Sequence, residues 1–305
     1  MKKWYWLVVW SAVIFNLFFS VALAQMVVID DRGREVRIEQ IPQRWVSLSP
    51  SNTEMVFALS LEDKLVGVTT YCNFPPEAEK KEKVGTITDV NLEKLILLEP
   101  DLVLASSLNP PELVEKLENL DFQVFVVEPR NITQVLDDLE KLAQIGGVEK
   151  EGRLLRQSLE ARIESVTSRV AHLPQAEKPR VLHLIWHDPL WTAGKGTFIH
   201  QFITLAGGVN VAFGLTDYAT LSVEELLLRN PEIITVVENH GSAENLPYQF
   251  ITTDYRFSSL AAVREGKVFR VDADIVSRPG PRVVEAVELF ARIIHPELFS
   301  PPEGE

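Results

Sequence analysis

The sequence predicts an α/β protein with two lobes, each built on a mainly parallel central sheet flanked by helices, and one long α-helix joining them. Three features of the 305-residue chain lead to this prediction. The stretch NLEKLILLEPDLVLA at 91–105 recurs in pattern as SVEELLLRNPEIITV at 222–236. Strand and helix patterns alternate on either side of a strand-free segment at 148–173. A repeat this widely spaced indicates two similar lobes rather than a solenoid, whose repeats are roughly 20–50 residues long.

The two copies of the repeat align without a gap. Glu93 falls on Glu224, and the prolines and apolar positions that follow also coincide. Each copy begins with a polar residue suited to capping a helix, Asn91 or Ser222, and places the glutamate in the first turn. The repeat therefore predicts a helix, a proline break and a buried strand in each lobe.

Composition narrows the function classes. Hydrophobic residues make up 46% and charged residues 24% of the chain, as in a globular protein. The net charge of −13, without any basic stripe, argues against a nucleic-acid partner. The single cysteine, Cys72, excludes an intramolecular disulfide and a multi-cysteine metal cluster. We expect a monomer.

Residues 1–24 match a signal peptide. Lys2 and Lys3 form a positively charged n-region, and residues 4–23 are mostly apolar. Residues 22–24 form an A-x-A cleavage site, so the mature chain would start at Gln25. Because the apolar run is long, an uncleaved membrane anchor is the alternative. No cysteine lies at the cleavage site, so a lipid anchor is not available there. These features predict export to the periplasm.

Before residue 147 the chain alternates between strand and helix patterns. A β-hairpin is predicted at 26–38, where apolar residues alternate around a DRG turn. Ser51 with Glu54 three residues later matches a capping box, so we expect a helix to begin there. Further strands are predicted at 44–48, 65–69 and 123–127, and further helices at 113–120 and 132–145. This order predicts a parallel sheet covered on both faces in an N-terminal lobe at 25–147.

The segment 148–173 reads as one continuous helix. Its apolar residues recur every three to four positions over about 26 residues, which is ~39 Å of helix. It is either a packing helix within one large domain or a rigid spacer between lobes. The spacer is favoured because the strand pattern restarts directly afterwards. In a C-terminal lobe at 174–299 the predicted strands are 180–186, 233–237 and 267–271, the helices 198–206 and 281–294, with a loop at 239–247 and a tail at 300–305.

Residues that follow the predicted strands are aromatic or polar. Open parallel sheets bind ligands beyond the carboxyl ends of their strands, and two such lobes can face each other across a cleft. Any one of these residues could be an ordinary loop anchor, but together they predict a ligand wall with large rigid rings. They are Tyr71, His187, Asp188, Trp191 and 274–278.

Catalytic and metal motifs are absent, so we predict no catalytic residue, no metal site and no cofactor. The chain has no G-x-S-x-G elbow, and GKGT at 194–197 lacks the spacing of a phosphate-binding loop. His183 and His187 fall on a strand, where they would lie ~13 Å apart and could not share an ion. Cys72 could be an exposed soft ligand, but a bystander role is favoured. An exported enzyme using Asp188, Glu238 or Asp274 as acid or base remains a remote alternative.

Several stretches together carry a family resemblance: VSLSPSNTEMVFAL (46–59), TTYCNFPPEA (69–78), VNLEKLILLEPDLVLA (90–105) and WTAGKGTFIHQFITLAGGVNV (191–211). The chain resembles the class III, helical-backbone periplasmic substrate-binding proteins of ABC importers for metal chelates, most closely the cobalamin-binding ones. The resemblance extends from about residue 27 to 295. It implies two α/β lobes joined by one helix, and a carrier that hands its ligand to an importer. A sensor subunit that signals to a membrane receptor is the other non-catalytic alternative.

The resemblance also implies a docking role for Glu93 and Glu224. In that family one glutamate on each lobe contacts arginines of the membrane permease dimer, and the motif positions correspond to these two residues. The alternative is that each glutamate stabilises the dipole of its own helix, by about 0.3–1 kcal/mol. Symmetric placement in both lobes favours the docking role.

For the ligand, the family positions that line the corrin cleft correspond to Tyr71, Trp191, Tyr218, Asp274 and Arg278. The rings would pack on the macrocycle, and the two charged groups would hydrogen-bond its amide periphery. Ile87 and Ser106 stand where a close relative has tryptophan, which leaves other corrinoids, haem or a ferric siderophore as alternatives to cobalamin. Haem would need an axial ligand such as Tyr71 or His187, and an anionic siderophore would need several arginines.

Overall fold

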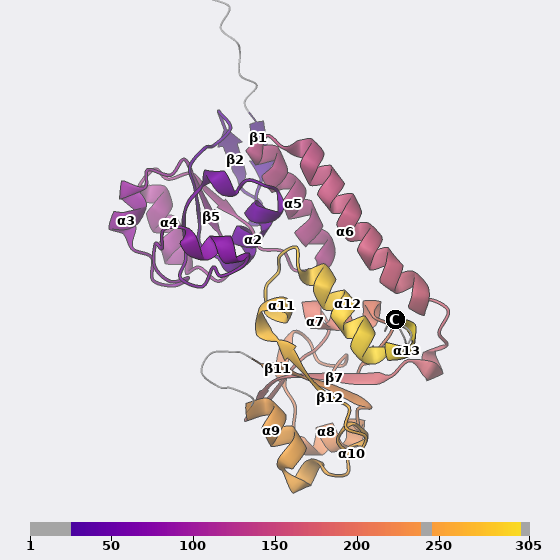
Figure 1. The fold of residues 1–305 in the computed structure, drawn as a ribbon. Helices are drawn as coiled ribbons and strands as arrows, with labels where there is room; N and C mark the ends of the chain where they lie inside the picture. The colour runs from indigo at the N-terminus through magenta and orange to yellow at the C-terminus, as the bar shows by residue number, and fades with distance from the viewer. Residues whose placement is uncertain (1–25, 239–245, 300–305) are drawn as a thin grey trace, which may run out of the picture.

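The computed structural model describes residues 26–238 and 246–299 and contains two lobes joined by one helix, α6 (Glu149–Val170) (Figure 1). The predicted signal peptide at 1–24, the tail at 300–305 and most of the loop at 239–247 lie outside these ranges. Within them, no helix is both long and apolar enough to cross a lipid bilayer. The predicted fold class is confirmed.

The N-terminal lobe contains a four-stranded, fully parallel sheet in the order β4-β3-β5-β6. Strands such as LVLA and VFV are buried along their whole length, as expected when helices cover both faces. An antiparallel hairpin, β1 (Met26–Ile29) and β2 (Glu35–Ile38), precedes the sheet. The other elements are β3 (Trp45–Ser47), α2 (Pro50–Ala58), η1 (Glu62–Lys64), β4 (Leu65–Val68), η2 (Pro76–Lys80), α3 (Leu92–Leu97), β5 (Leu102–Ala105), α4 (Pro111–Asn119), β6 (Val124–Val126) and α5 (Ile132–Gly146).

The C-terminal lobe has a mixed sheet in the order β10-β8-β7-β11-β12, with β9 also paired to β7. Strands β7, β9, β11 and β12 are parallel, whereas β8 and β10 form an antiparallel edge. Its elements are η3 (Gln175–Glu177), β7 (Arg180–His187), β8 (Leu190–Ala193), α7 (Phe198–Leu205), β9 (Val209–Asn210), β10 (Tyr218–Thr220), α8 (Val223–Arg229), β11 (Ile233–Glu238), α9 (Leu246–Thr253), η4 (Tyr255–Phe257), α10 (Ala261–Arg264), β12 (Val268–Asp272), α11 (Ala273–Ser277), α12 (Val283–Ile294) and α13 (Pro296–Phe299).

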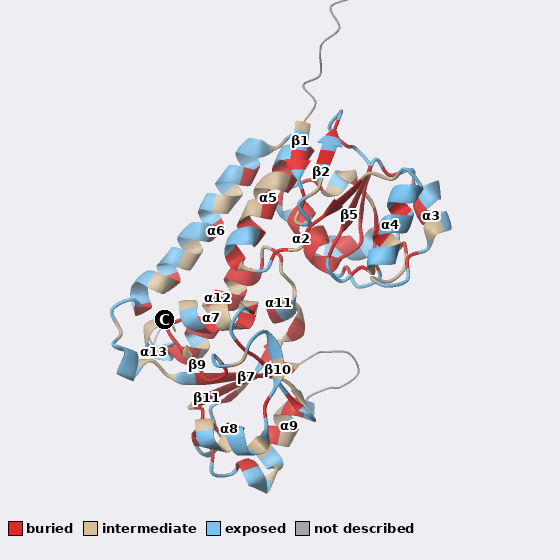
Figure 2. Cartoon of the chain, turned by 180° about the vertical axis from the view of Figure 1, so that it is seen from behind, coloured by how far each residue is buried: buried red, intermediate tan, exposed pale blue. Residues whose placement is uncertain are grey.

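Helix α6 both spans the lobes and packs on them. It lies against α5 in the N-terminal lobe and against α12 and α7 in the C-terminal lobe. In Figure 2 its outer face is exposed. Its buried residues include Leu159 and Val166. These leucine and valine side chains belong to one apolar cluster that contains Trp45 of the first lobe and Phe290 of the second. The lobes therefore share a continuous core.

The predicted capping box at the start of α2 is wrong. The helix begins at Pro50, and the preceding Ser49 is the N-cap, its hydroxyl accepting a hydrogen bond from the Asn52 amide at 3.3 Å. A proline suits the first helical position because its missing N–H would be unpaired there anyway, so the residue before it becomes the cap. Glu54 is therefore free of a capping role, and its side chain is buried between the lobes.

The repeated unit is present in both backbones. Asn91 and Ser222 cap α3 and α8 as expected, each accepting a backbone N–H. Both helices end in a left-handed residue just before the proline, Glu99 with φ of 44° and Asn230 with φ of 40°. Because non-glycine residues seldom adopt this conformation, its recurrence shows that the two units share geometry as well as sequence pattern.

A buried carboxyl group in the N-terminal lobe makes stability depend on pH. Asp138 on α5 lies 2.8 Å from Lys141, which also pairs with Asp31 at 2.6 Å. Burial raises the pKa of Asp138 to about 7, and the nearby Asp31 carboxylate adds to this, while the hydrogen bond to Lys141 opposes it. The pKa of aspartate in an unfolded chain is about 4. Between roughly pH 4 and pH 7 the folded chain therefore holds a proton on Asp138 that the unfolded chain has lost. Stability from this group falls as pH rises through that window.

Replacing Asp138 with asparagine should remove this pH dependence. The variant is expected to gain stability over the native protein as pH increases from 5 to 8, because it has no charge to bury. Urea unfolding at pH 5, 6, 7 and 8 measures the difference. Glu115→Gln on the exposed surface of α4 makes the same charge change and should leave the profile unaltered. Parallel profiles for Asp138→Asn and the native protein would contradict the prediction.

Candidate ligand-binding site

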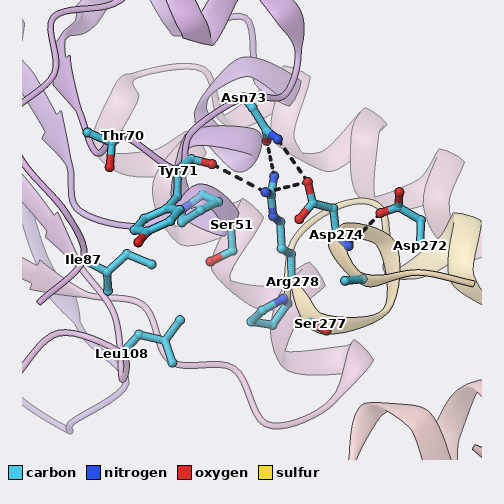
Figure 3. Close-up of a pocket in the computed structure, with 13 residues that line it drawn as sticks. Ser51, Thr70, Tyr71, Asn73, Ile87, Leu108, Asp272, Asp274, Ser277 and Arg278 are labelled. Carbon is cyan, nitrogen blue, oxygen red and sulfur yellow. Dashed lines mark hydrogen bonds and ion pairs between the residues drawn. The ribbon is translucent and has the colours of Figure 1, made fainter. Parts of the chain in front are cut away.

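Two adjoining cavities lie between the lobes, beyond the carboxyl ends of the sheet strands, and a third adjoins them inside the C-terminal lobe. The largest, of about 700 Å³, is shown in Figure 3 and is lined by both lobes. Ser51 and Leu108 of the first lobe and Ser277 and Pro279 of the second also line the next cavity, of about 390 Å³, so the two are continuous. Tyr218 connects this space to a third cavity of about 270 Å³ inside the C-terminal lobe.

Large aromatic rings face this space from both lobes. Tyr71, in the loop after β4, is 55% exposed, Tyr218 on β10 is 50% exposed and Trp191 on β8 is 40% exposed. The register of β8 and β10 pairs Tyr218 with Ala193, two residues from Trp191, so the two rings are diagonal neighbours on one face. Rigid rings left exposed in a cleft provide apolar surface for a flat ligand.

Tyr218 contributes a neutral hydroxyl. Burial, with a smaller contribution from the neighbouring Asp217 carboxylate, raises the pKa of the Tyr218 phenol. The group therefore stays protonated and can both donate and accept a hydrogen bond. In the same cavity burial lowers the pKa of His183 to about 3, so this histidine is neutral, with Nδ1 2.9 Å from the Thr235 hydroxyl.

Arg278 and Asp274 form a polar network with Asn73 on the opposite lobe (Figure 3). Arg278 Nη2 lies 2.7 Å from Asp274 Oδ2, and Arg278 Nη1 donates to Asn73 Oδ1 at 2.7 Å. Asn73 Nδ2 in turn donates to Asp274 Oδ2 at 3.1 Å. The network joins the lobes beside Tyr71, and it already occupies much of the hydrogen-bonding capacity of Arg278.

Glu54 pairs with Arg278 and with a second arginine, Arg282. Arg282 donates to both Glu54 oxygens, from Nη2 at 2.7 Å and from Nε at 2.9 Å, and Arg278 Nη1 adds a third contact at 3.0 Å. The Phe74 ring lies 4.0 Å from the Arg282 guanidinium. Although burial by itself lowers the pKa of Arg282, its hydrogen bond and charge interaction with Glu54 raise it overall. Both arginines are thus charged and paired across the lobe interface.

The charges that line the cavities do not form a cationic site. The ionised side chains among the lining residues are four carboxylates, Asp272, Asp274, Glu128 and Asp217, and two arginines, Arg278 and Arg130. Arg130 is itself 3.6 Å from Glu128. The excess of negative charge would therefore repel an anionic ligand, whereas it would not repel a neutral one.

Metal ligands are not gathered in the cleft. Within 26–238 and 246–299 no three His, Cys, Asp or Glu side chains are grouped to hold a metal ion. Cys72 is buried, with Sγ near the hydroxyls of Thr53 at 3.1 Å and Thr69 at 3.2 Å, so the idea of an exposed soft ligand is wrong. His187 lines none of the three cavities; its ring packs against Trp186 and Phe250.

The structure brings all five predicted ligand residues to the cavities. Tyr71, Asp274 and Arg278 line the largest one, and Trp191 and Tyr218 line the third. Asp188 instead lies exposed in the two-residue turn between β7 and β8, away from the cavities. Four residues at the site were not predicted from the sequence, Ser51, Asn73, Leu108 and Glu54, whereas Ser277 falls within the predicted stretch 274–278. Asn73 could have been found because it lies two residues from Tyr71 in the same loop.

Glu93 and Glu224 lie far from the cavities, on α3 and α8, and both are exposed. Across the part of the chain that the structure describes, neither carboxylate has a hydrogen bond or ion pair. They are therefore available to a partner, and they occupy equivalent positions in their two lobes.

Comparisons with known proteins agree with this architecture. Residues 46–275 match the family model for periplasmic binding proteins. The uncharacterized ABC transporter substrate-binding lipoprotein YvrC of Bacillus subtilis is 33% identical, covering 90% of this chain and 87% of its own. The periplasmic vitamin B12 binding protein BtuF of Vibrio cholerae has a TM-score of 0.71 at 27% identity, over 83% of this chain and 97% of its own.

A third relative binds a different chelate. The periplasmic heme-binding protein BhuT, in complex with two hemes, has a TM-score of 0.74 at 26% identity, over 84% of this chain and 98% of its own. The resemblance seen in the sequence is thus confirmed at the level of the family. This chain belongs to the periplasmic binding protein family and is a substrate-binding protein of the ABC transporter type.

Proposed function

We propose that this chain is an extracytoplasmic carrier that captures cobalamin or a related corrinoid in the cleft between its lobes and delivers it to an ABC importer. The observation that carries the proposal is the combination of three exposed aromatic rings with a cleft in which the arginines are already paired. A corrinoid is a large flat macrocycle whose periphery carries neutral amide groups. The aromatic rings provide the packing surface for the macrocycle. Polar oxygen atoms and hydroxyl groups around the rings provide hydrogen bonds to its amides.

Haem is the second candidate, supported by one specific observation. Tyr71 presents its phenol to the largest cavity (Figure 3) and could serve as an axial ligand of a haem iron. Haem, however, carries two propionates, and an anionic siderophore carries comparable charge. Both need free cationic groups, whereas Arg278 and Arg282 are held by Glu54. The charge balance therefore favours the corrinoid.

The carrier role involves no resident cofactor and no catalytic step, since the metal chelate is cargo. The carboxylates considered for an enzyme are dispersed: Asp188 is in an exposed turn, and Asp274 is paired with Arg278. We further propose that Glu93 and Glu224 dock on the importer. Because Cys72 is the single cysteine and is buried, we propose that export occurs through a cleaved signal peptide without lipid attachment.

Titration of the purified exported protein with cyanocobalamin, haem and a ferric siderophore tests the ligand. We expect saturable quenching of tryptophan fluorescence by cyanocobalamin at micromolar concentration or below, with weaker binding of the other two. Trp191 borders the cleft while Trp45 is buried in the core. The variant Trp191→Phe should therefore lose much of the quenching but keep most of the affinity, because the phenyl ring preserves the packing surface.

Two outcomes would count against the proposal. If haem or the siderophore binds and no corrinoid does at micromolar concentration, the corrinoid is replaced by that chelate. If quenching by cyanocobalamin is identical in Trp191→Phe and the native protein, the ligand does not occupy the described cleft.

A further inference from the structure

The two lobes each expose one leucine almost completely. Leu97 on α3 is 81% exposed and Leu228 on α8 is 85% exposed, the highest values among the large apolar side chains of the described chain apart from Tyr255. An exposed leucine contributes nothing to the core of its own lobe. Burying apolar surface is favourable, so each leucine would stabilise a complex in which a partner covers it.

The two leucines are equivalent in the repeat. Leu97 aligns with Leu228, just as Glu93 aligns with Glu224. Figure 1 shows α3 at the outer end of the N-terminal lobe and α8 in the outer part of the C-terminal lobe, both away from α6. Isolated exposed apolar residues are common and need no explanation. Leu97 and Leu228 differ from such isolated residues because they hold equivalent positions in two separate lobes.

Each leucine also lies next to its glutamate. Both pairs are spaced by four residues within one helix, so leucine and glutamate are on the same helical face, one turn apart. In Figure 2 these helices carry exposed outer faces. In each lobe the middle residue of the three between them, Leu95 or Leu226, is buried in the core and fixes the helix orientation. Each lobe therefore presents an unpaired carboxylate and an apolar side chain together.

We propose that Leu97 and Leu228 are the apolar half of a two-point docking surface, each inserting into an apolar pocket beside a cationic side chain on the importer's membrane subunits. This rests on the proposed docking role of Glu93 and Glu224 and adds the residues that supply contact energy. Two equivalent Glu–Leu pairs on one chain fit a partner that presents the same surface twice, as a twofold-symmetric dimer does. The carboxylates set orientation and association rate, and the leucines slow dissociation.

Binding to the importer tests this proposal. The importer's permease–ATPase complex, reconstituted in lipid nanodiscs, would be titrated with Leu97→Ser, Leu228→Ser and the double variant. Each single variant should bind about tenfold more weakly, and the double variant more weakly still. The dependence of affinity on salt should stay that of the native protein, because no charge changes. Leu154→Ser, at an exposed leucine of α6, is the matched control and should bind normally.

The outcomes separate the leucines from the glutamates. If the leucine variants bind like the native protein while Glu93→Lys and Glu224→Lys abolish binding, the leucine role is wrong and docking through the glutamates stands. If neither set has an effect, docking through α3 and α8 is wrong altogether. If the native protein forms dimers at micromolar concentration in sedimentation and the leucine variants do not, the leucines contact a second copy and the proposal fails. Thermal melting and cyanocobalamin titration check that each variant is folded.

Discussion

Replacing Glu54 with glutamine is expected to lower the free energy of unfolding by about 3–5 kcal/mol. The change leaves Arg282 buried and Arg278 mostly buried without the carboxylate that both contact at 2.7–3.0 Å. An unpaired buried charge destabilises the folded state by far more than an exposed ion pair stabilises it. Urea unfolding at neutral pH, followed by circular dichroism, measures the loss. Ligand affinity should fall as well, because the same group holds the two walls of the cleft together.

The ion pair of Glu82 with Lys94 supplies the control. It has a similar N–O distance of 2.6 Å, but both side chains are about half exposed. Glu82→Gln should therefore lower the free energy of unfolding by less than about 1 kcal/mol. If Glu54→Gln is no more destabilising than this surface change, the lobe interface does not depend on the buried carboxylate.

Charge reversal of both Glu93 and Glu224 to lysine should abolish uptake of the ligand while leaving its capture intact. Under the proposed docking role, each reversal would replace an attractive contact with a cationic importer group by a repulsive one, and removing one such interfacial charge costs about 2–5 kcal/mol. Two together would weaken docking by at least a hundredfold. The cleft is unaffected because neither residue lines a cavity, so affinity for cyanocobalamin should stay within about twofold of the native value.

Uptake of radiolabelled cyanocobalamin by cells lacking the native gene measures the first effect, and titration of purified protein measures the second. Glu115→Lys, on an exposed position of α4, controls for the change in net charge. Full uptake by the double variant would show that these glutamates serve only their own helices. Loss of uptake together with loss of ligand binding would point to misfolding instead.

The N-terminal lobe follows closely from its sequence because its strands are continuous apolar runs separated by clear turns. The C-terminal lobe departs more, since its sheet has an antiparallel edge. Strand β8 starts only two residues after β7 ends, and its residues LWTA carry no alternating pattern to mark a strand. Their pairing depends on β7 and β10 beside them, which a local pattern cannot show.

Tyr71 was predictable because it follows the end of a strand, whereas Trp191 and Tyr218 lie within the edge strands β8 and β10. The electrostatics of the cleft were not predictable. Glu54 and Arg282 lie 228 positions apart in the chain, and their contact exists only after the lobes are placed. In the sequence Glu54 matched a capping box, and Arg278 looked like a free ligand for amide groups. The structure shows that Glu54 and Arg278 pair with each other, so that arginine is not a free cation in the cleft.

The continuous core beneath α6 has a consequence for how such a protein could arise and be altered. The two lobes repeat one structural unit, yet the cluster containing Trp45, Leu159 and Phe290 belongs to neither alone. A duplicated unit could be joined in this way only if the connecting helix acquired apolar residues on the sides facing both copies. Through this helix the two halves share one apolar cluster. A lobe exchanged between relatives would have to bring its share of the helix with it.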